Sequence, residues 1–295
     1  MPDTTDTWAA PPGSPVGTRG WYLAADGEWY RSVDPPAPGY WLSEDGRWYA
    51  AEATNEPWRT SRWGLGDVWW VALAYVLAGV TGAVVLAIVD DAVDGGIDED
   101  TAPVIAAFVA LNAIATVGVV WVATRRKGLA SLRRDFGLAV RRWDPLIGFG
   151  LGIAALIVAG AASYGIDSAF GAEEATSNVP VDDLRSFGEF AIFFVAVAIV
   201  TPFVEELFFR GLLYRSLLKR NRSAPRAIAA TTLIFVIPHL PAVDSWPEVA
   251  SLFASIGILG LAFNLACHWT GNRLAAPIVA HAVVNGLATI ALYTT

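Results

Sequence analysis

The chain after residue 62 is dominated by long stretches that contain no charged residue. Residues 68–89, 101–124 and 145–166 hold 22, 24 and 22 consecutive residues without a formal charge. About 20 helical residues are enough to cross a hydrocarbon core roughly 30 Å thick. These stretches lack the strict apolar–polar alternation that the strands of a membrane β-barrel require. The pattern therefore predicts three membrane-spanning helices.

Four further spans are expected in the second half of the chain. Residues 187–214, 226–239, 249–268 and 274–293 are mostly apolar, although ionisable residues interrupt some of them. Lipid offers no hydrogen-bond partner to an open strand edge, so each span is predicted to be a helix. Only 16% of the residues are charged, against about 25% in soluble domains. We therefore expect an all-α polytopic membrane protein with about seven transmembrane helices.

Residues 1–62 follow a different pattern, which repeats with a period of 19 residues. Residues 20–30 recur as residues 39–49, and each copy places aromatic residues on both sides of an Asp-Gly pair. Asp-Gly tolerates the positive φ angles of a tight turn, so each copy is predicted to form a small β-hairpin. The repeat resembles the short Trp-rich modules found in front of many bacterial membrane proteins. It either docks an unidentified cytoplasmic partner or is a tether that packs its own aromatics, since isolated hairpins are marginal.

The positive charges predict the orientation in the membrane. If the N-terminus is cytoplasmic and the loops alternate, 19 of the 20 Lys and Arg residues face the cytoplasm, and the outer loops are acidic. This asymmetry follows the positive-inside rule. We expect an integral protein of a bacterial plasma membrane, whose basic loops contact lipid and do not bind nucleic acid. The expected parts are a Trp-rich cytoplasmic segment (1–62), N-terminal transmembrane helices (63–185) and a C-terminal core (186–295).

Three of the later spans reach membrane length only if they include ionisable residues. Residues 190–204 give 15 uncharged positions before Glu205 and Glu206, residues 227–238 give 12 before His239, and residues 274–280 give 7 before His281. A charged residue inside the membrane costs on the order of 2.5–3.5 kcal/mol even on the mildest scale, and such residues usually mark function. These side chains are therefore the default candidates for a functional site.

The spacing of these residues separates their expected roles. Glu206 and Arg210 are four positions apart on one helix, so they share a face and can form an ion pair. Glu205 points about 100° away around the helix and does not share that partner. One carboxylate is thus neutralised by its neighbour, while Glu205 stays available for proton transfer.

Three motifs then resemble a known family. Glu205-Glu206-x-x-x-Arg210, Phe235-x-x-x-His239 and His281-x-x-x-Asn285 follow one another on successive helices. In this order they resemble the CAAX-processing and bacteriocin-processing (CPBP, or Abi) intramembrane proteases, which include the type II CAAX prenyl endopeptidases. The resemblance covers roughly residues 186–293, which makes residues 186–295 a CPBP-type protease core.

The resemblance implies hydrolysis of a peptide bond in a cavity open to the cytoplasmic leaflet. Glu205 and His239 would activate a water molecule, and His281 and Asn285 would donate hydrogen bonds to the tetrahedral oxyanion. The other motif residues would support the site: Glu206, Arg210 and Phe235. The expected substrate is a membrane-associated protein or peptide tail, prenylated or not.

The requirement for a cofactor stays open at this stage. The resemblance is compatible with a metalloprotease and with a metal-free, glutamate-dependent enzyme. Glu205, His239 and His281 would also make a workable zinc set with one open position. The alternatives for the site are therefore a divalent metal such as zinc, or none.

Two other classes of function use the same residues differently. A proton-coupled transporter would use the ionisable side chains as a proton relay, and an inactive immunity or scaffold protein would only bind a partner. Transporters usually carry internal repeats, and the two halves of the membrane region show no repeat in sequence. A scaffold would not need Glu205. The endopeptidase hypothesis is therefore preferred.

Overall fold

The computed structural model describes residues 57–92, 96, 101–170, 184, 186–221, 223–242 and 245–294, together with four short strands near the N-terminus. The chain divides into two compact units, Met1–Arg62 and Trp63–Thr295. Since the candidate site residues all belong to the second unit, that unit is described in more detail.

Two antiparallel strand pairs form the regular structure of the first unit. β1 (Trp21–Leu23) pairs with β2 (Trp29–Arg31), and β3 (Tyr40–Leu42) pairs with β4 (Trp48–Ala50). The register places Tyr22 opposite Tyr30 in the first pair and Trp41 opposite Tyr49 in the second. A short 3-10 helix, η1 (Pro57–Thr60), follows. The Asp-Gly residues expected at the turns lie outside the described residues, so the hairpin turns stay a prediction.

All regular secondary structure among the described residues of the second unit is helical. Six helices in this described part are long and apolar enough to cross a membrane, which makes this an integral membrane protein. They are α1 (Leu65–Ala92), α2 (Ala102–Lys127), α4 (Asp144–Phe170), the run Phe187–Arg220, α9 (Trp246–Trp269) and α10 (Ala275–Thr294). The five-residue helix α3 (Leu132–Phe136) connects α2 to α4.

The expected count of seven membrane spans is not confirmed. The apolar helix at Ala224–Leu240 is shorter than the six spanning candidates. It consists of α8 (Ala224–Val236) and a 3-10 turn, η4 (Ile237–Ala242). Proline has no N–H to donate and clashes with the preceding turn, so Pro238 and Pro241 end the α-helix here. His239 consequently lies in the 3-10 turn.

The run Phe187–Arg220 alternates between α-helix and π-helix. Its segments are α5 (Phe187–Phe194), the π-helix η2 (Val195–Val200), α6 (Thr201–Glu206), the π-helix η3 (Leu207–Tyr214) and α7 (Arg215–Asn221). π-helical turns are rare and often occur at functional sites. Here the two π-helices flank the α-helical segment that ends with the adjacent glutamates.

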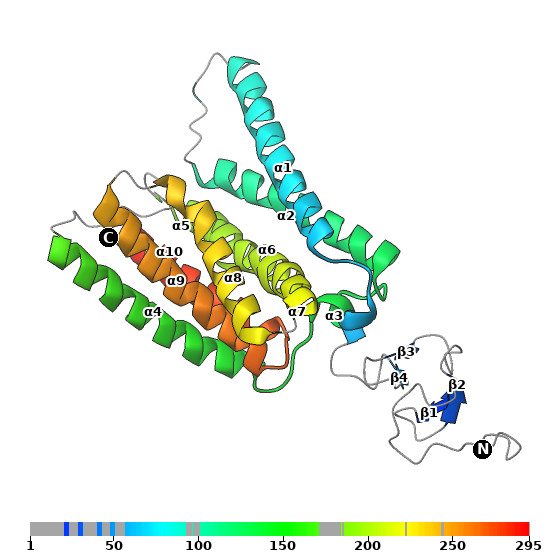
Figure 1. Cartoon of the computed structure of the whole chain (residues 1–295). Helices are drawn as coiled ribbons and strands as arrows, with labels where there is room; N and C mark the ends of the chain where they lie inside the picture. The colour runs from blue at the N-terminus through cyan, green and yellow to red at the C-terminus, as the bar shows by residue number, and fades with distance from the viewer. Residues whose placement is uncertain are drawn as a thin grey trace, which may run out of the picture. The chain divides into compact units, whose positions relative to one another are not determined.

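The helix α10 is enclosed by its neighbours in the bundle. It packs against α4 and α9 and, on another side, against η2 and α6, while α8 covers α9 (Figure 1). Glycines allow α4 to come very close: a Cβ added at Gly152 would lie 2.7 Å from the carbonyl oxygen of Ala280. Small residues at such contacts let helix backbones approach in membranes. The close packing fixes the position of α10, which carries two candidate residues.

Buried polar contacts join the helices at the basic end of this unit. The carboxylate of Asp135 is fully buried and accepts hydrogen bonds from Trp63 Nε1 at 2.9 Å, the backbone N–H of Leu129 at 2.8 Å and the Thr124 hydroxyl. The Arg215 guanidinium donates to the backbone carbonyl of Asp135 at 2.8 Å. These contacts tie α2, α3 and α7 together at one end.

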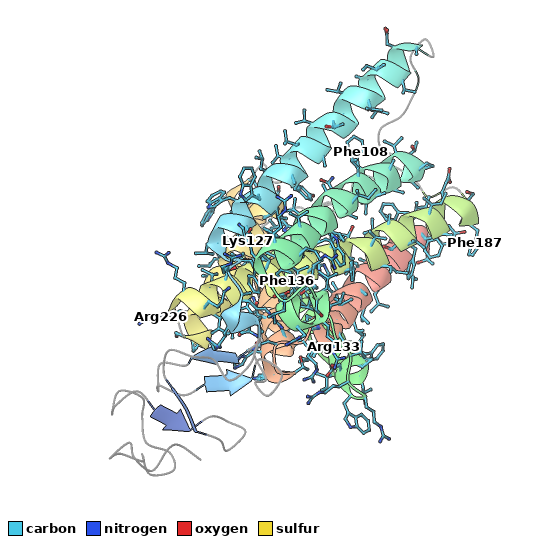
Figure 2. All side chains as sticks on the ribbon, turned by 90° about the vertical axis from the view of Figure 1, so that its right-hand side faces the viewer. Phe108, Lys127, Arg133, Phe136, Phe187 and Arg226 are labelled. Atoms are coloured by element: carbon cyan, nitrogen blue, oxygen red, sulfur yellow. The ribbon has the colours of Figure 1, made fainter. Side chains whose placement is uncertain are left out.

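An ion pair fastens the loop before α10 to the start of α4. Arg273 donates from Nε and Nη2 to the two oxygens of Asp144, at 2.8 and 2.7 Å. The hydrogen bond and the charge of Asp144 raise the pKa of Arg273, so this pair stays charged at any ordinary pH. In Figure 2, Arg133 and Arg226 lie at this end of the bundle and Phe187 lies at the other.

Candidate active site

The imidazole of His281 lies between the two adjacent glutamates. Its Nδ1 is 2.9 Å from Oε1 of Glu206, and its Nε2 is 3.9 Å from Oε2 of Glu205. The Glu206 side chain is fully buried, whereas that of Glu205 keeps 29% of its surface exposed. The structure therefore brings together side chains from α6 and α10 that are 75 residues apart in sequence.

Arg210 neutralises Glu206, as the spacing predicted. Its Nη1 donates to Oε1 of Glu206 at 2.7 Å, and its Nη2 donates to the carbonyl oxygen of Gly260 at 2.9 Å. Its guanidinium lies 4.6 Å from the ring centroid of Phe235 and 5.3 Å from that of Phe263. Aromatic faces attract a cation, more strongly where water is excluded. The buried positive charge is thus surrounded by one carboxylate, one carbonyl and aromatic rings.

The hydrogen-bond partners of His281 and His239 indicate which ring nitrogen of each carries the proton. The Glu206 carboxylate accepts, so the Nδ1–H of His281 donates, and the Nε2 of a neutral His281 carries a lone pair. The Nδ1 of His239 lies 3.1 Å from the carbonyl oxygen of Phe235, which also can only accept. In each neutral ring Nε2 is therefore an acceptor. His281 can donate to an oxyanion only when it carries a second proton.

Asn285 lies one helical turn beyond His281 on α10. Its amide nitrogen donates to the carbonyl oxygen of Val197 at 2.9 Å, in the π-helix η2. An asparagine amide has two N–H donors, so one remains for another acceptor. The contact holds the side chain in a fixed orientation.

All four candidate catalytic side chains line one cavity of about 260 Å³. Glu205, His239, His281 and Asn285 contribute its polar wall, together with two threonines. The remaining lining is apolar: Phe193, Val197, Phe235, Ile256, Leu259, Phe263, Val284, Ala288 and Leu292. The sequence-predicted residues on η4, α6 and α10 thus share a single polar chamber.

The cavity is elongated along the helices. It runs from Glu205 to Phe193 on one side and from His281 to Leu292 on the other, each about 17 Å by helix rise. On these two helices the lining does not continue past Glu205 or His281 toward the basic loops. Glu205 and His281 therefore lie at one end of the lining on these two helices, which extends toward the opposite, Phe187 end. The resemblance predicts a cavity that is open to the cytoplasmic leaflet, which is the side of the basic loops, whereas the lining on these two helices extends the other way.

The structure does not group these side chains as the ligands of a metal ion. Within the part of the chain that the structure describes, no group of three or more His, Cys, Asp or Glu side chains is placed to hold a metal ion. Glu205, His239 and His281 line the same cavity without forming such a group. The zinc set that the sequence allowed therefore stays a prediction.

Sequence reasoning missed several residues of the site. The ring of Phe263 stacks on His281 with centroids 4.6 Å apart, and the carbonyl of Gly260 accepts from both Arg210 and Asn264. A Cβ at Gly260 would lie 2.9 Å from the Phe235 ring, so a larger residue would displace that ring. The signal available in the sequence was Asn264, a polar residue in an apolar helix, on the same face as Gly260.

The fold and the cavity define a class of protein: a polytopic membrane protein with a polar chamber inside its helix bundle. Residues 187–287 match the family model described as type II CAAX prenyl endopeptidase Rce1-like. This match supports the resemblance of residues 187–287 to the CPBP family of intramembrane proteases. Neither the curated proteins nor the solved structures yield a match.

Proposed function

We propose that this protein is an intramembrane endopeptidase that hydrolyses a peptide bond of a membrane-associated protein or peptide tail. The observation that carries the proposal is the shared cavity of Glu205, His239, His281 and Asn285. The domain match supports the reaction class, because its family model describes endopeptidases.

Glu205 is the proposed general base. It is the only one of the two adjacent glutamates with an exposed side chain, since Glu206 is buried against Arg210 and His281. Glu205 takes a proton from a water molecule as the water oxygen attacks the substrate carbonyl carbon. Nε2 of His239 accepts a hydrogen bond from the remaining water proton and so orients the nucleophile. When the C–N bond breaks, Glu205 returns the proton to the leaving amine.

Asn285 and protonated His281 are the proposed oxyanion donors. The second amide N–H of Asn285 and the Nε2–H of His281 would point at the oxygen that becomes negative. In other hydrolases one such donor contributes about 2.7–4 kcal/mol to transition-state stabilisation. Glu206 positions His281 through the 2.9 Å contact with Nδ1, and Arg210 holds Glu206 in place. No step in this mechanism passes through a metal.

The shape of the cavity favours an extended, apolar substrate segment. The walls of the chamber are mostly apolar, and on α10 the lining continues from His281 to Leu292, about 17 Å by helix rise. An extended chain spans about 3.3 Å per residue, so roughly five substrate residues would fill it.

We place the protein in a bacterial plasma membrane with its N-terminus in the cytoplasm. The Trp-rich repeats would bind a cytoplasmic partner.

The test is proteolysis by the purified full-length protein in lipid nanodiscs. Solubilised membrane proteins would be added, and new amino termini would be tagged and identified by mass spectrometry. The parent protein should generate new termini, whereas Glu205→Gln and His239→Ala should not. Glu189→Gln removes a carboxylate from the same helical run outside the cavity and should leave cleavage unchanged. Cleavage by all variants at the parent rate would overturn the proposal, as would Glu205-dependent proton-driven uptake without any cleavage.

A further inference from the structure

The short helix α8 leads into the turn that holds His239, and its largest contact is with α9. Side chains of α8 lie directly on the backbone of α9 at Gly260: a Cβ added there would lie 2.9 Å from the Phe235 ring and 3.6 Å from Cγ2 of Thr232. Thr232 precedes His239 by seven residues, about two helical turns. The position of His239 in the site therefore depends on how α8 lies on α9.

Asn264 forms a hydrogen bond across this contact. It is fully buried in α9, and its Nδ2 lies 3.0 Å from Oγ1 of Thr232 and 3.0 Å from the carbonyl oxygen of Gly260. A carbonyl oxygen only accepts, so the amide nitrogen, and not the amide oxygen, faces Gly260. Both amide hydrogens are therefore used, one within α9 and one toward α8.

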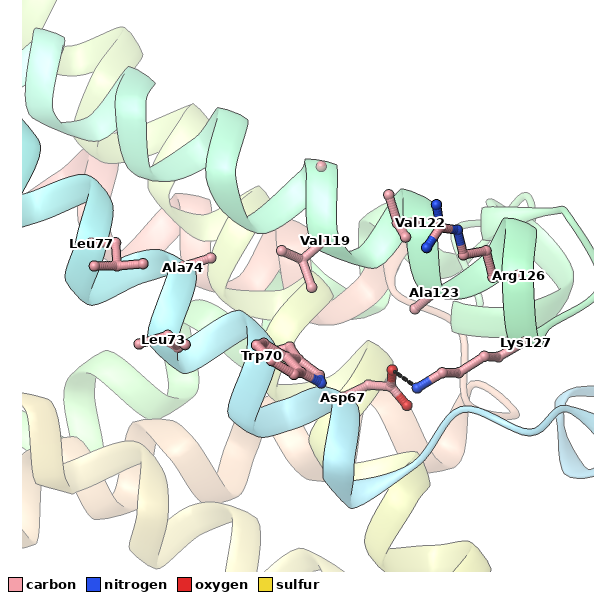
Figure 3. Close-up of a pocket in the computed structure, with 11 residues that line it drawn as sticks. Asp67, Trp70, Leu73, Ala74, Leu77, Val119, Val122, Ala123, Arg126 and Lys127 are labelled. Carbon is pink, nitrogen blue, oxygen red and sulfur yellow. Dashed lines mark hydrogen bonds and ion pairs between the residues drawn. The ribbon is translucent and has the colours of Figure 1, made fainter.

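The depth of Asn264 in its helix distinguishes this contact from an ion pair at helix ends. Lys127, the last residue of α2, donates from Nζ to Oδ1 of Asp67, the third residue of α1, at 2.7 Å (Figure 3). Asn264 instead lies inside a candidate membrane span, where polar side chains are costly and usually functional. Its Oδ1 has no hydrogen-bond partner among the described residues, so stability alone does not account for an asparagine here.

Through Gly260, Asn264 is linked to the residues that hold His281. The Gly260 carbonyl also accepts from Nη2 of Arg210 at 2.9 Å. Nη1 of Arg210 donates to Glu206 at 2.7 Å, and Oε1 of Glu206 lies 2.9 Å from Nδ1 of His281. One amide hydrogen of Asn264 thus contacts the network behind His281.

Through Thr232, the same side chain is linked to His239. Thr232 and Phe235 are three positions apart on α8 and share a face, and the carbonyl of Phe235 accepts from Nδ1 of His239 at 3.1 Å. A change in the register of α8 on α9 would move this carbonyl and the imidazole together. A single side chain, Asn264, therefore joins the two halves of the site.

We propose that Asn264 is a positioning residue that fixes His239 relative to His281. The inference rests on the proposed function, in which His239 orients the attacking water and His281 binds the oxyanion. Both oxygens belong to one tetrahedral intermediate, so the two imidazoles must keep a fixed separation. Asn264 does not line the cavity and acts only through Thr232 and Gly260. A displacement of about 1 Å in a site can lower a rate about 100-fold.

Adjacent threonines on α8 provide a matched pair of variants. Thr232→Val removes the hydroxyl that Asn264 contacts, whereas Thr231→Val removes a hydroxyl that donates within α8, to the carbonyl oxygen of Ala227 at 2.8 Å. Asn264→Leu removes both amide contacts with a side chain of similar shape. Because Thr232 acts through Asn264, adding Thr232→Val to Asn264→Leu should lower kcat no further.

The first measurement follows peptide cleavage and thermal unfolding of the full-length protein in nanodiscs. Asn264→Leu and Thr232→Val should lower kcat about 10- to 100-fold and leave KM nearly unchanged, whereas Thr231→Val should behave like the parent. The unfolding temperature of Asn264→Leu should equal or exceed that of the parent, because leucine leaves no buried amide oxygen unpaired. A parent-like kcat for Asn264→Leu, or a lower unfolding temperature together with the lower kcat, would overturn the inference.

The second measurement needs no substrate. Spin labels at Ile237→Cys on η4 and Leu287→Cys on α10, both exposed positions, report the distance between the two segments by pulsed electron paramagnetic resonance. Asn264→Leu should shift or broaden this distance and Thr231→Val should not; an unchanged distance in Asn264→Leu would overturn the inference. If the parent cleaves no peptide, the proposed function fails, and the distance alone decides whether Asn264 holds α8 in place.

Discussion

Two neighbouring carboxylates have opposite surroundings in this protein. Glu206 is fully buried and contacts Arg210 and His281, whereas Glu205 reaches the cavity with part of its surface exposed. A buried charge is stable only when it is paired and hydrogen-bonded. Of the two carboxylates, Glu206 is therefore held in a buried network, and Glu205 is the one that lines the cavity.

This difference predicts opposite effects for two matched variants. Glu206→Gln leaves the Arg210 charge buried without its carboxylate, so we expect a loss of about 3–5 kcal/mol in the free energy of unfolding. Glu205→Gln should change that free energy little but reduce the rate of cleavage at least about 100-fold. Thermal unfolding in detergent and a peptide-cleavage assay would measure the two quantities. Equal destabilisation by both variants would contradict the division of roles.

Asn285 allows a test of the oxyanion contact. Asn285→Ala should lower kcat about 100-fold or more with little change in KM, because the donor acts mainly in the transition state. Thr289→Val is a suitable control, since Thr289 lines the same cavity but its hydroxyl donates to the backbone carbonyl of Asn285. Steady-state kinetics of both variants would measure kcat and KM and so test whether the contribution of Asn285 is made in the transition state. A rise in KM alone for Asn285→Ala would assign this residue to ground-state binding.

The sequence predicts four polar residues of the cavity, Glu205, His239, His281 and Asn285, but not its two threonines or the contacts between helices. The spacing of Glu206 and Arg210 predicts their ion pair, and the structure confirms it. No spacing rule shows that Glu206 also holds Nδ1 of His281, because that contact crosses from α6 to α10. The apolar and backbone contributors to the site, such as Phe263 and Val197, carry no charge and stand out from no neighbouring residue.

The contact between α4 and α10 is the element-scale feature on which the site most depends. Gly152 permits the close approach of the two backbones, and its contact residue, Ala280, directly precedes His281. Any side chain at Gly152 would push α10 away and move His281 relative to the glutamates. The geometry of the site thus depends on a residue that never touches the cavity.

Two glycines on α4 provide a matched test of this dependence. Gly152→Ala should lower the free energy of unfolding by about 1–3 kcal/mol through overpacking and should also reduce cleavage. Gly150→Ala should be neutral or slightly stabilising, because a Cβ there meets no atom within 4 Å and alanine favours helix. Thermal unfolding and the cleavage assay would compare them. Similar behaviour of the two variants would show that the close approach does not matter.

Charged residues marked the helix ends only approximately. The first predicted span, residues 68–89, lies inside α1 (Leu65–Ala92), because the helix continues through Asp67 and the terminal aspartates that the uncharged-run criterion excludes. The span expected at 226–239 was less accurate, since Pro238 converts its end to a 3-10 turn. The π-helices could not be predicted at all, because an i→i+5 register leaves no clear signature in sequence.

At the scale of the whole molecule, the candidate active site is contained in one of two compact units. All the cavity residues belong to Trp63–Thr295, and the Trp-rich repeats belong to Met1–Arg62. The sequence predicts a change of character at this position from its composition alone. The direction in which the cavity extends could not be predicted, because it depends on how four helices pack around one chamber.

This division predicts that the repeats are dispensable for the chemistry. A protein that begins at Trp63 should cleave a short membrane-embedded peptide at a rate within about twofold of the parent, because it retains every cavity residue. Cleavage of a natural substrate should fall if the repeats bind it or its partner. The comparison requires both substrates in the same nanodiscs. Loss of cleavage of the short peptide would show that the first unit contributes to the site.

The most direct test of the account is to follow the water molecule itself. A peptide cleaved by the parent protein would be incubated with it in water enriched in oxygen-18, and the new carboxyl terminus would be weighed by mass spectrometry. If Glu205 and His239 activate water, the product should carry one oxygen-18 atom, and Glu205→Gln should release no product. A product without the label, or labelled product formed at the parent rate by Glu205→Gln, would contradict a glutamate-activated hydrolysis.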